Sequence, residues 1–207
     1  IDNDRFSTNS DHFEKEANIW KQKLGIRDNH FVVLYAGKFD KIKNPGFILE
    51  VAKKLQGDSY RFVLVGNGPL ESELKHNNHD DRIIFLDFQN QNVMPVVYRL
   101  GNVVVLSSNS ETWGLAVNEA MACNRPVITN NMVGCAVDLI VSQKNGLVIN
   151  KSDYEGAAEF IKKLKTGLIS QEQVKSVNSS LLSVYSFSSI VNAVCDLLKA
   201  LQKKPLL

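Results

Sequence analysis

Short apolar runs alternate along the chain with longer segments whose apolar residues recur at helical spacing. The runs are rich in β-branched residues and continuously apolar, which is typical of strands buried on both faces of a parallel sheet. Because alternating strands and helices form βαβ units, the pattern predicts a Rossmann-like α/β fold with a parallel sheet of about six strands and helices on both faces. The predicted strands are Phe31–Tyr35, Arg61–Val65, Ile83–Leu86, Val103–Leu106, Pro126–Ile128 and Leu147–Ile149.

The segments around these strands predict helices. Apolar residues between Phe47 and Leu55 recur on one face of a helix that begins near Pro45, a residue suited to a first turn. Ser152–Glu155 has the residue types of a capping box, which predicts a helix start there and an end near Lys165. The other predicted helices are Phe13–Leu24, a short polar helix after Pro69, Val93–Leu100, Leu115–Cys123, Gln171–Val184 and Ser188–Gln202.

Composition narrows the class of protein. The 207 residues are 44% hydrophobic and 22% charged, as in ordinary globular proteins. A dispersed net charge of +2 argues against a nucleic-acid partner. No apolar run approaches the roughly 18 residues that span a bilayer, and no signal peptide opens the sequence. We therefore expect a cytoplasmic protein whose three cysteines are free thiols and which has no metal site.

Candidate anion-binding residues follow the first two strands. Gly37, Lys38 and Lys43 lie between a strand and a helix start, where cations and helix amides favour phosphate oxygens. Taken alone, the two lysines are better explained as part of a solvated surface, because surface lysines are common. Gly66 and Asn67 form a second glycine-containing turn, which lacks the third glycine and downstream acid of a dinucleotide fingerprint.

Polar and acidic residues are most concentrated after the fourth strand. Glu111 and Trp113 lead into Gly114 and Leu115, whose amides at a helix start are free to bind an anion, and Glu119 follows in that helix. Carboxylates suit vicinal hydroxyls, which makes a sugar or a ribose the expected partner. Spacing alone is equally compatible with a surface Glu111 and a Glu119 that complements the helix dipole.

The segment SETWGLAVNEAMACNRPVI, with seven residues between Glu111 and Glu119, resembles the signature of the family-4 retaining glycosyltransferases. These enzymes have two Rossmann-like domains, the GT-B architecture. AGKFDKIKNP resembles their phosphate loop, and FVLVGNGP resembles their glycine-rich turn. NNMVGCAVDLI and QKNGLVI are similar to the loop and strand after the signature helix. These segments occur in the family's order over residues 31–165.

The resemblance implies a role for each matching residue. Lys38 and Lys43 neutralise the donor diphosphate, Glu111 faces the donor sugar, and these three residues are the implied catalytic set. Glu119 binds the ribose of the nucleotide. The remaining implied nucleotide-sugar-binding residues are Gly37, Gly66, Asn67, Phe88, Trp113, Gly114 and Leu115, with Phe88 in the loop that holds the base.

The chain departs from the family pattern at three positions. Lys38 stands where the family usually has Arg, which replaces a bidentate fork by a point charge. Asn44 and Asp87 each stand where glycine is usual. Asp87 lies in the loop that is expected to hold the base.

The resemblance also implies a domain organisation. Residues 1–29 are expected to be a segment connecting from an N-terminal, acceptor-binding domain, followed by a helix. Residues 30–185 are the expected donor-binding domain, the C-terminal half of a GT-B fold. Residues 186–207 are expected to form a closing helix that packs toward the absent domain. The isolated chain is therefore expected to be inactive.

The implied reaction transfers a sugar from a UDP- or GDP-linked donor to an acceptor hydroxyl, with retention of anomeric configuration and no metal cofactor. Polysaccharide, lipopolysaccharide or glycolipid synthesis is the implied setting, with peripheral contact of the full-length enzyme at the inner face of the membrane. Two alternatives stay open. One is a nucleotide-sugar epimerase, which the Trp113–Glu119 context disfavours, and the other is a non-catalytic nucleotide-sugar-binding module.

Overall fold

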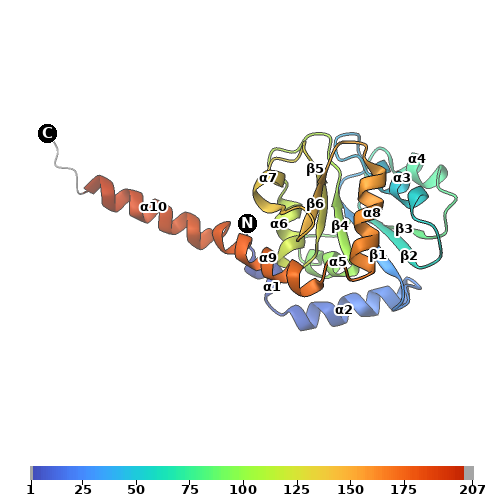
Figure 1. The fold of residues 1–207 in the computed structure, drawn as a ribbon, viewed down its shortest axis with the longest axis horizontal. Coiled ribbons are helices and arrows are strands. Elements are labelled where there is room, and N and C mark those ends of the chain that lie inside the picture. Colours follow the sequence, from blue (N-terminus) through green and yellow to red (C-terminus); the bar gives the residue numbers. More distant parts are fainter. Residues whose placement is uncertain (1, 203–207) are drawn as a thin grey trace.

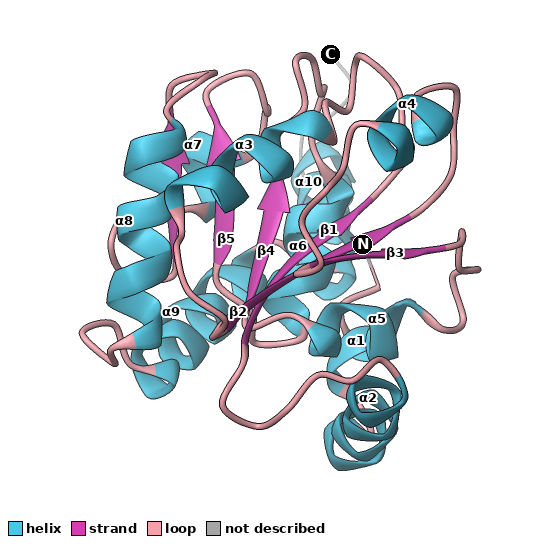
Figure 2. Cartoon of the chain, turned by 90° about the vertical axis from the view of Figure 1, so that its right-hand side faces the viewer, coloured by secondary structure: helices cyan, strands magenta, loops and turns pink. Residues whose placement is uncertain are grey.

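The structure, a computed structural model, describes residues 2–202 and is built on one parallel sheet (Figures 1 and 2). Its six strands lie in the order β3-β2-β1-β4-β5-β6. The α/β prediction and the number of strands are thus confirmed. The strands are β1 (Phe31–Ala36), β2 (Tyr60–Val65), β3 (Ile83–Leu86), β4 (Val103–Leu106), β5 (Val127–Asn130) and β6 (Gly146–Ile149).

The order of the strands reverses at β1. The chain proceeds from β1 outward to β2 and β3, and then returns to the other side of β1 to form β4, β5 and β6. β1 therefore pairs with both β2 and β4, and Val33 lies opposite Phe62 on one side and Val103 on the other. Ligands of open parallel sheets bind beyond the carboxyl ends of the strands at such a switch point.

Helices cover both faces of the sheet (Figure 2). α3 (Gly46–Lys54), α4 (Glu71–His76) and α8 (Tyr154–Lys165) pack their apolar sides on one face. On the other face lie α1 (Asp4–Ser7), α2 (Ser10–Lys23), α5 (Met94–Leu100), α6 (Leu115–Ala122) and α7 (Ala136–Leu139). α9 (Gln171–Val184) closes one end and contributes to both cores, through Val174 and Leu182.

Two details of the helices differ from the sequence prediction. α1 and α7 are single turns that no periodicity announced. The prediction of a capping box that begins at Ser152 is wrong. The N-cap of α8 is Asp153, whose Oδ1 accepts a hydrogen bond from the Gly156 amide (2.8 Å). Glu155 is not free to complete such a box, because its carboxylate pairs with Lys54 Nζ on α3 (2.5 Å).

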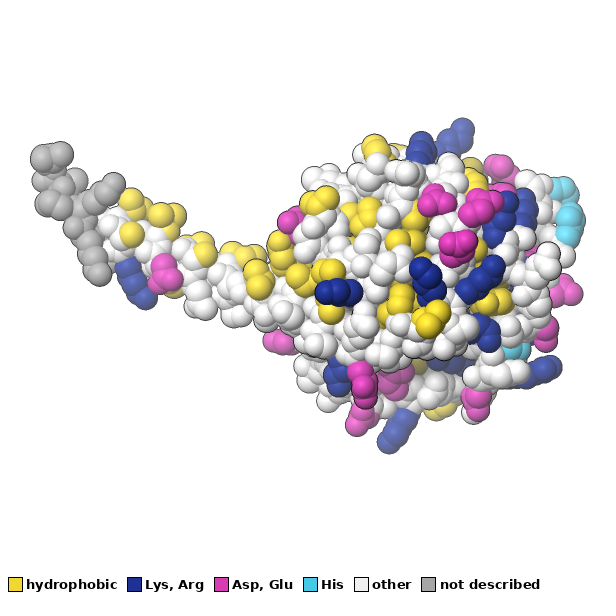
Figure 3. All heavy atoms as spheres, viewed as in Figure 1, with side chains coloured by type: hydrophobic (Ala, Val, Ile, Leu, Met, Phe, Trp, Pro, Cys, Tyr) yellow, Lys and Arg dark blue, Asp and Glu magenta, His cyan; other side chains and the backbone are white. Residues whose placement is uncertain are grey.

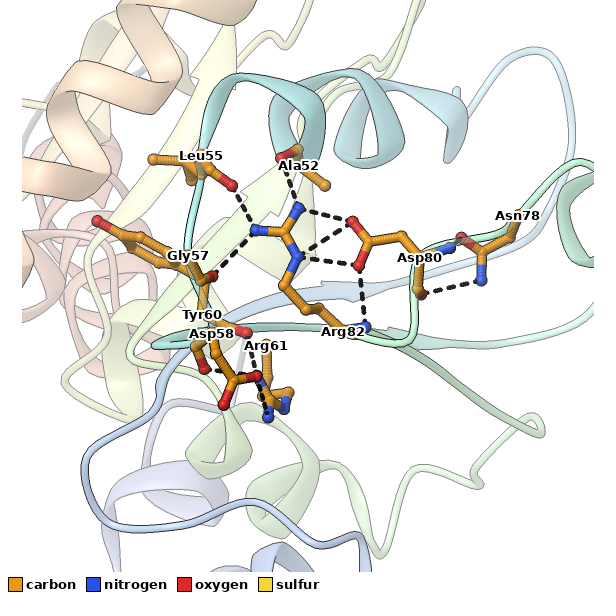
Figure 4. A network of polar contacts seen from close by, with 9 residues as sticks. All are labelled: Ala52, Leu55, Gly57, Asp58, Tyr60, Arg61, Asn78, Asp80 and Arg82. Carbon is orange, nitrogen blue, oxygen red and sulfur yellow. Dashed lines mark hydrogen bonds and ion pairs between the residues drawn. The ribbon is translucent and has the colours of Figure 1, made fainter.

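One arginine fastens the amino ends of the strands to α3. Arg82, just before β3, donates to the carbonyl oxygens of Ala52 (3.0 Å) and Leu55 at the end of α3 (Figure 4). Its guanidinium also pairs with Asp80 (2.6 Å). The guanidinium thereby satisfies carbonyls that the helix end leaves without partners and fixes the end opposite the expected ligand site.

A second arginine holds the first two helices against the sheet layer. Arg99 on α5 is completely buried, and its Nη2 donates to the carbonyl oxygen of Phe6 (2.8 Å). Its Nη1 donates to the carbonyl oxygen of Pro95 (2.8 Å), and its guanidinium lies over the ring of Phe13 on α2. Residues 4–23 therefore share one core with the residues that follow them.

α10 (Phe187–Gln202) projects away from this body (Figure 1). Its apolar side chains are all more than half exposed and give the arm its hydrophobic surface (Figure 3): Phe187, Ile190, Val191, Val194, Leu197, Leu198 and Leu201. The expectation that this helix begins at Ser188 is confirmed to within one residue. Gln202 is described only as helix, and residues 1 and 203–207, which the domain predictions included, lie outside the described residues.

The segment containing α10 corrects the expectation that no apolar stretch is long enough to span a bilayer. By length and composition alone, the helical stretch Gln171–Leu201 meets the criterion for a membrane span, with a mean hydropathy of 1.5 in its most apolar window. However, the helix is interrupted at Tyr185, and α9 packs Val174 and Leu182 into the body. The apolar window, none of which is buried, is therefore made up mainly of α10, an exposed helix that also carries charged Asp196 and Lys199.

Candidate functional site

A cleft of about 680 Å³ opens at the carboxyl ends of β1, β2 and β4, at the switch point of the sheet. The loops that follow these strands, together with α5 and α6, form its walls. Every residue proposed from the sequence as a site residue lies on its surface: Gly37, Lys38, Lys43, Gly66, Asn67, Phe88, Glu111, Trp113, Gly114, Leu115 and Glu119. Their chemical roles stay predictions.

Two glycines bring the first wall together. The backbone of Gly66 has a φ of 151°, and a Cβ at this position would collide with the carbonyl oxygen of Gly37. The loops after β1 and β2 are also joined by a hydrogen bond from the Phe39 amide to the Asn67 carbonyl oxygen (2.7 Å). Close backbone contact thus holds the Lys38 loop against the glycine-rich turn.

Asn44 explains how this loop tolerates the loss of a glycine. Its φ of 51° lies in the left-handed region, which glycine adopts freely and asparagine adopts better than most other residues. The Asn44 carbonyl oxygen accepts a hydrogen bond from Ser107 Oγ (2.9 Å), and its Nδ2 donates to the Ser107 carbonyl oxygen (3.3 Å). The β1–α3 loop is therefore attached to the loop after β4 across the switch point.

The two sequence-distant groups Lys43 and Glu111 form an ion pair across this junction. Lys43 Nζ contacts Glu111 Oε2, and the two side chains are 33% and 20% exposed. Lys38 also lies on the cleft wall. Lys43, which is predicted to bind the donor diphosphate, is thus paired with Glu111, which is predicted to bind the donor sugar. Both side chains are partly exposed to solvent.

The start of α6 forms the floor next to Glu111. Gly114 is the N-cap residue with a φ of 102°, and no side chain in the described part of the chain caps the helix there. Trp113 is held beside it, because its indole Nε1 donates to Asn118 Oδ1 (2.9 Å) and its ring packs on Tyr185. The α6 amides are therefore presented to the cleft beside a fixed aromatic ring.

Glu119, on α6, forms a second wall of the cleft together with α5. Tyr98 on α5 is 1% exposed, and its hydroxyl donates to Glu119 Oε2 (2.7 Å). Burial raises the pKa of the Glu119 carboxyl, while the Tyr98 hydrogen bond and the charge of Arg5 act in the opposite direction. Burial also raises the pKa of Tyr98 well above its usual range, so Tyr98 is a phenol that donates its proton.

The far end of the cleft is formed by the β3–α5 loop. Phe88 lies there with 63% of its surface exposed, next to Gln91 and Met94. Arg5 reaches this loop from α1, where its Nη1 donates to Gln91 Oε1 (3.2 Å). Among these residues the sequence identified only Phe88.

Sequence reasoning missed several lining residues, of which Tyr98 is the most informative. Gln91, Met94 and Thr112 also line the cleft without having been singled out. Tyr98 lies in an apolar helix, where an aromatic residue is expected in the core. Its signal was the hydroxyl itself, since a buried phenol nearly always has a hydrogen-bond partner.

Comparison with known proteins identifies the family of this fold and cleft. The sequence model described as "Glycosyl transferases group 1" matches residues 16–178. The chain belongs to this family. A curated relative, the capsular polysaccharide biosynthesis glycosyltransferase CapM of Staphylococcus aureus, is 31% identical over 76% of this chain and 44% of its own length. The chain spans about a third to a half of the length of such curated relatives.

Solved structures agree on the fold. The Anabaena protein HepE, determined in complex with UDP-glucose, superposes with a TM-score of 0.79 at 18% identity, over 97% of this chain and 56% of HepE. The C-terminal domain of a group 1 family glycosyl transferase from Francisella tularensis gives a TM-score of 0.71 at 22% identity, over 90% of this chain and 99% of that domain. The fold is thus that of one half of a GT-B glycosyltransferase.

The cleft combines two kinds of chemistry. One wall offers two ammonium groups and free helix amides, which bind anionic oxygens, and the other offers a carboxylate suited to paired hydroxyls. Within residues 2–202 no group of three or more His, Cys, Asp or Glu residues is placed to hold a metal ion. The expected independence of metal stays a prediction.

Proposed function

We propose that this chain is the donor-binding part of a glycosyltransferase that moves a sugar from a nucleoside-diphosphate sugar to an acceptor hydroxyl. The observation that carries the proposal is the division of the cleft at the switch point. Lys38, Lys43 and the α6 N-terminus line one part of the cleft, which we assign to the diphosphate, and Glu119 lines another, which we assign to the ribose. Binding of UDP-glucose by HepE, which has the same fold, supports a donor of this class.

The electrostatics suit departure of the sugar from a diphosphate. Negative charge grows on the diphosphate as the glycosidic bond breaks, and preorganised donors stabilise that charge most effectively. Lys38, Lys43 and the amides at Gly114 and Leu115 supply such donors. This support needs no metal ion, in keeping with the metal-independent reaction that we propose.

The Lys43–Glu111 pair gives the donor sugar a specific place. When the diphosphate enters, its oxygens compete with Glu111 for Lys43, and the released carboxylate can accept hydrogen bonds from sugar hydroxyls. Each of the two groups therefore exchanges one partner for another, and neither is left unpaired. Glu111 is accordingly assigned to sugar recognition rather than to attack on the sugar.

The neighbouring thiol does not act as a nucleophile in this scheme. Cys135 is buried beneath the start of α6, with its Sγ 3.7 Å from the Gly114 carbonyl oxygen. Burial raises the pKa of this thiol to about 12, so it stays protonated at neutral pH. Retention of anomeric configuration is therefore proposed without a covalent step at this residue.

The rest of the enzyme is proposed to lie on a second domain. The acceptor site and the pathway, in polysaccharide, lipopolysaccharide or glycolipid synthesis, depend on that domain. The exposed apolar face of α10 is proposed to pack against it, since such a face is costly to leave in water. A cytoplasmic enzyme in peripheral contact with the membrane, without a nucleic-acid partner, completes the proposal.

Isothermal calorimetry with UDP, GDP and inorganic pyrophosphate tests the proposal on this chain. We expect at least one nucleotide to bind with a dissociation constant on the order of 0.1–1 mM and pyrophosphate to bind more weakly, because only the nucleotides reach Glu119. The absence of binding of either nucleotide at millimolar concentration, with circular dichroism showing a folded chain, would contradict it. No sugar transfer is expected from the chain by itself.

A further inference from the structure

Tyr98 is almost completely buried, and its hydroxyl is the polar group of its side chain that it brings to the cleft. The ring lies on α5 inside the core, yet its oxygen reaches Glu119 Oε2 on α6 at 2.7 Å. The bond occupies one carboxylate oxygen of Glu119 from the protein side. Because a carboxylate has two oxygens, the other is left for a ligand in the cleft.

Tyr98 is itself held from a third helix. The ring of Phe6 on α1 contacts it edge to face, with ring centroids 6.0 Å apart and planes inclined by 62°. Phe6 is fixed in turn, because Arg99 donates to its carbonyl oxygen (2.8 Å). The phenol therefore cannot swing away from Glu119 without disturbing α1, and its hydrogen bond has a set direction.

The hydrogen bond opposes what burial does to Glu119. The groups that face this carboxyl are the Tyr98 hydroxyl from α5 and the Arg5 guanidinium from α1, with the buried Cys123 thiol on the same helix. Burial raises the pKa of Glu119, whereas the Tyr98 bond and the Arg5 charge lower it. Burial raises the pKa of Cys123 to about 12, so this thiol brings no charge near neutral pH.

We infer that Tyr98 is a positioning residue for nucleotide binding: its hydroxyl orients the Glu119 carboxylate toward the ribose hydroxyls. The inference rests on the proposed function, since it assigns Glu119 to a ribose. It adds that ribose recognition is a three-helix unit, in which α1 fixes the tyrosine, α5 carries it and α6 carries the acid. The two lysines assigned to the phosphates, Lys38 and Lys43, lie outside this unit.

Substitution of Tyr98 by Phe removes only the hydroxyl. For Tyr98→Phe we expect the affinity for the nucleotide that the unmodified chain binds to fall about tenfold, because a hydrogen bond to a charged group is lost. Affinity for inorganic pyrophosphate should stay within about twofold, because that ligand has no ribose. Tyr60→Phe is the matched control. Tyr60 is a buried phenol at the amino end of β2, away from the cleft, so this substitution should change neither affinity.

A pH series separates positioning from packing. A protonated Glu119 is a poorer acceptor, so ribose-dependent affinity decreases as the pH falls through the pKa of Glu119. Loss of the Tyr98 bond raises that pKa further, so in Tyr98→Phe the decrease begins at a higher pH. Titration of the phosphate groups affects the unmodified chain and Tyr98→Phe equally, so it cancels when their affinities are compared. The ¹³C chemical shift of the labelled Glu119 carboxyl measures the change in its pKa without ligand.

Tyr98→Phe could lower nucleotide affinity by destabilising the fold, and a double-mutant cycle with Glu119 distinguishes that effect from loss of the hydrogen bond. In a Glu119→Ala background, Tyr98→Phe should have no further effect on nucleotide affinity, because its target is gone. Equal losses of nucleotide and pyrophosphate affinity, or an unchanged Glu119 titration, would show that Tyr98 only supports the core and would overturn the inference. If the unmodified chain binds neither nucleotide, the proposed function fails first, and the inference fails with it.

Discussion

The two walls of the cleft are proposed to recognise ligands in opposite ways. On the diphosphate wall, Lys38 and Lys43 extend from a loop, and Lys43 is partly exposed and paired with Glu111. On the ribose wall, Glu119 is fixed on a helix by a buried tyrosine. Charge attraction acts over a distance and tolerates mobile side chains, whereas hydrogen bonds to hydroxyls depend on direction. We therefore assign electrostatic attraction of the donor to one wall and selection of the ribose to the other.

The largest effect is expected from removal of both cations. Lys38→Ala combined with Lys43→Ala should weaken nucleoside diphosphate and pyrophosphate alike, on the order of 100-fold, since two charge-assisted contacts are lost. Binding by the unmodified chain should weaken as salt increases, and binding by the variant should respond less. Calorimetry at two salt concentrations measures this, with exposed Lys23→Ala on α2 as the control. A selective loss of nucleotide would contradict the assignment of this wall.

Removal of Glu119 should have a smaller and selective effect. Glu119→Ala is expected to reduce nucleotide affinity about 30-fold, because ribose hydroxyls lose a charged acceptor, while pyrophosphate affinity stays nearly constant. The ratio of the two dissociation constants is the measurement. A ratio equal to that of the unmodified chain would remove the distinction between the walls.

Glu111 pairs with Lys43 and is assigned to the donor sugar, so its removal should have opposite effects on two ligands. In Glu111→Ala the Lys43 ammonium loses its partner, and pyrophosphate should bind up to about threefold more tightly. The preference for a nucleotide-sugar over the bare nucleotide should decrease, because the sugar loses its acceptor. Competition calorimetry with UDP-glucose or another nucleotide-sugar detects both changes. Weaker binding of pyrophosphate would show that Glu111 acts on the loop rather than on the sugar.

The smallest expected effect concerns stability. Burial raises the pKa of Glu119 in the folded chain above its unfolded value. The protonated form is therefore favoured by folding, and this contribution is present at low pH and lost as the pH rises through the folded pKa. Glu119→Gln, which stays neutral, should melt about 2 °C higher than the unmodified chain at pH 7 and show a smaller difference near pH 4.5. Thermal melts at both pH values test whether the ribose wall is maintained at a cost in stability.

Much of the fold follows from local pattern. Continuous apolar runs such as Val103–Leu106 become buried strands, and their order of alternation with helices leads to a parallel sheet. The start of α8 shows where local pattern misleads. Ser152 and Glu155 have the residue types of a capping box, but Glu155 pairs with Lys54 on α3, a residue far away in the sequence. The helix start is instead capped by the neighbouring Asp153, which accepts a hydrogen bond from the Gly156 amide.

The sequence by itself determined which chemical groups lie beyond the carboxyl ends of the strands, because the strand periodicity and the residues after each strand are local properties. Periodicity predicted one cleft at those strand ends, and the family resemblance selected Lys38, Lys43, Glu111 and Glu119 as its residues, all of which line it. Only the tertiary structure decided how these groups are paired. Lys43 meets Glu111 across 68 positions because β1 and β4 are neighbours, and Tyr98 meets Glu119 across 21 positions because α5 packs on α6. Such partners depend on the packing of whole elements, which no local pattern encodes.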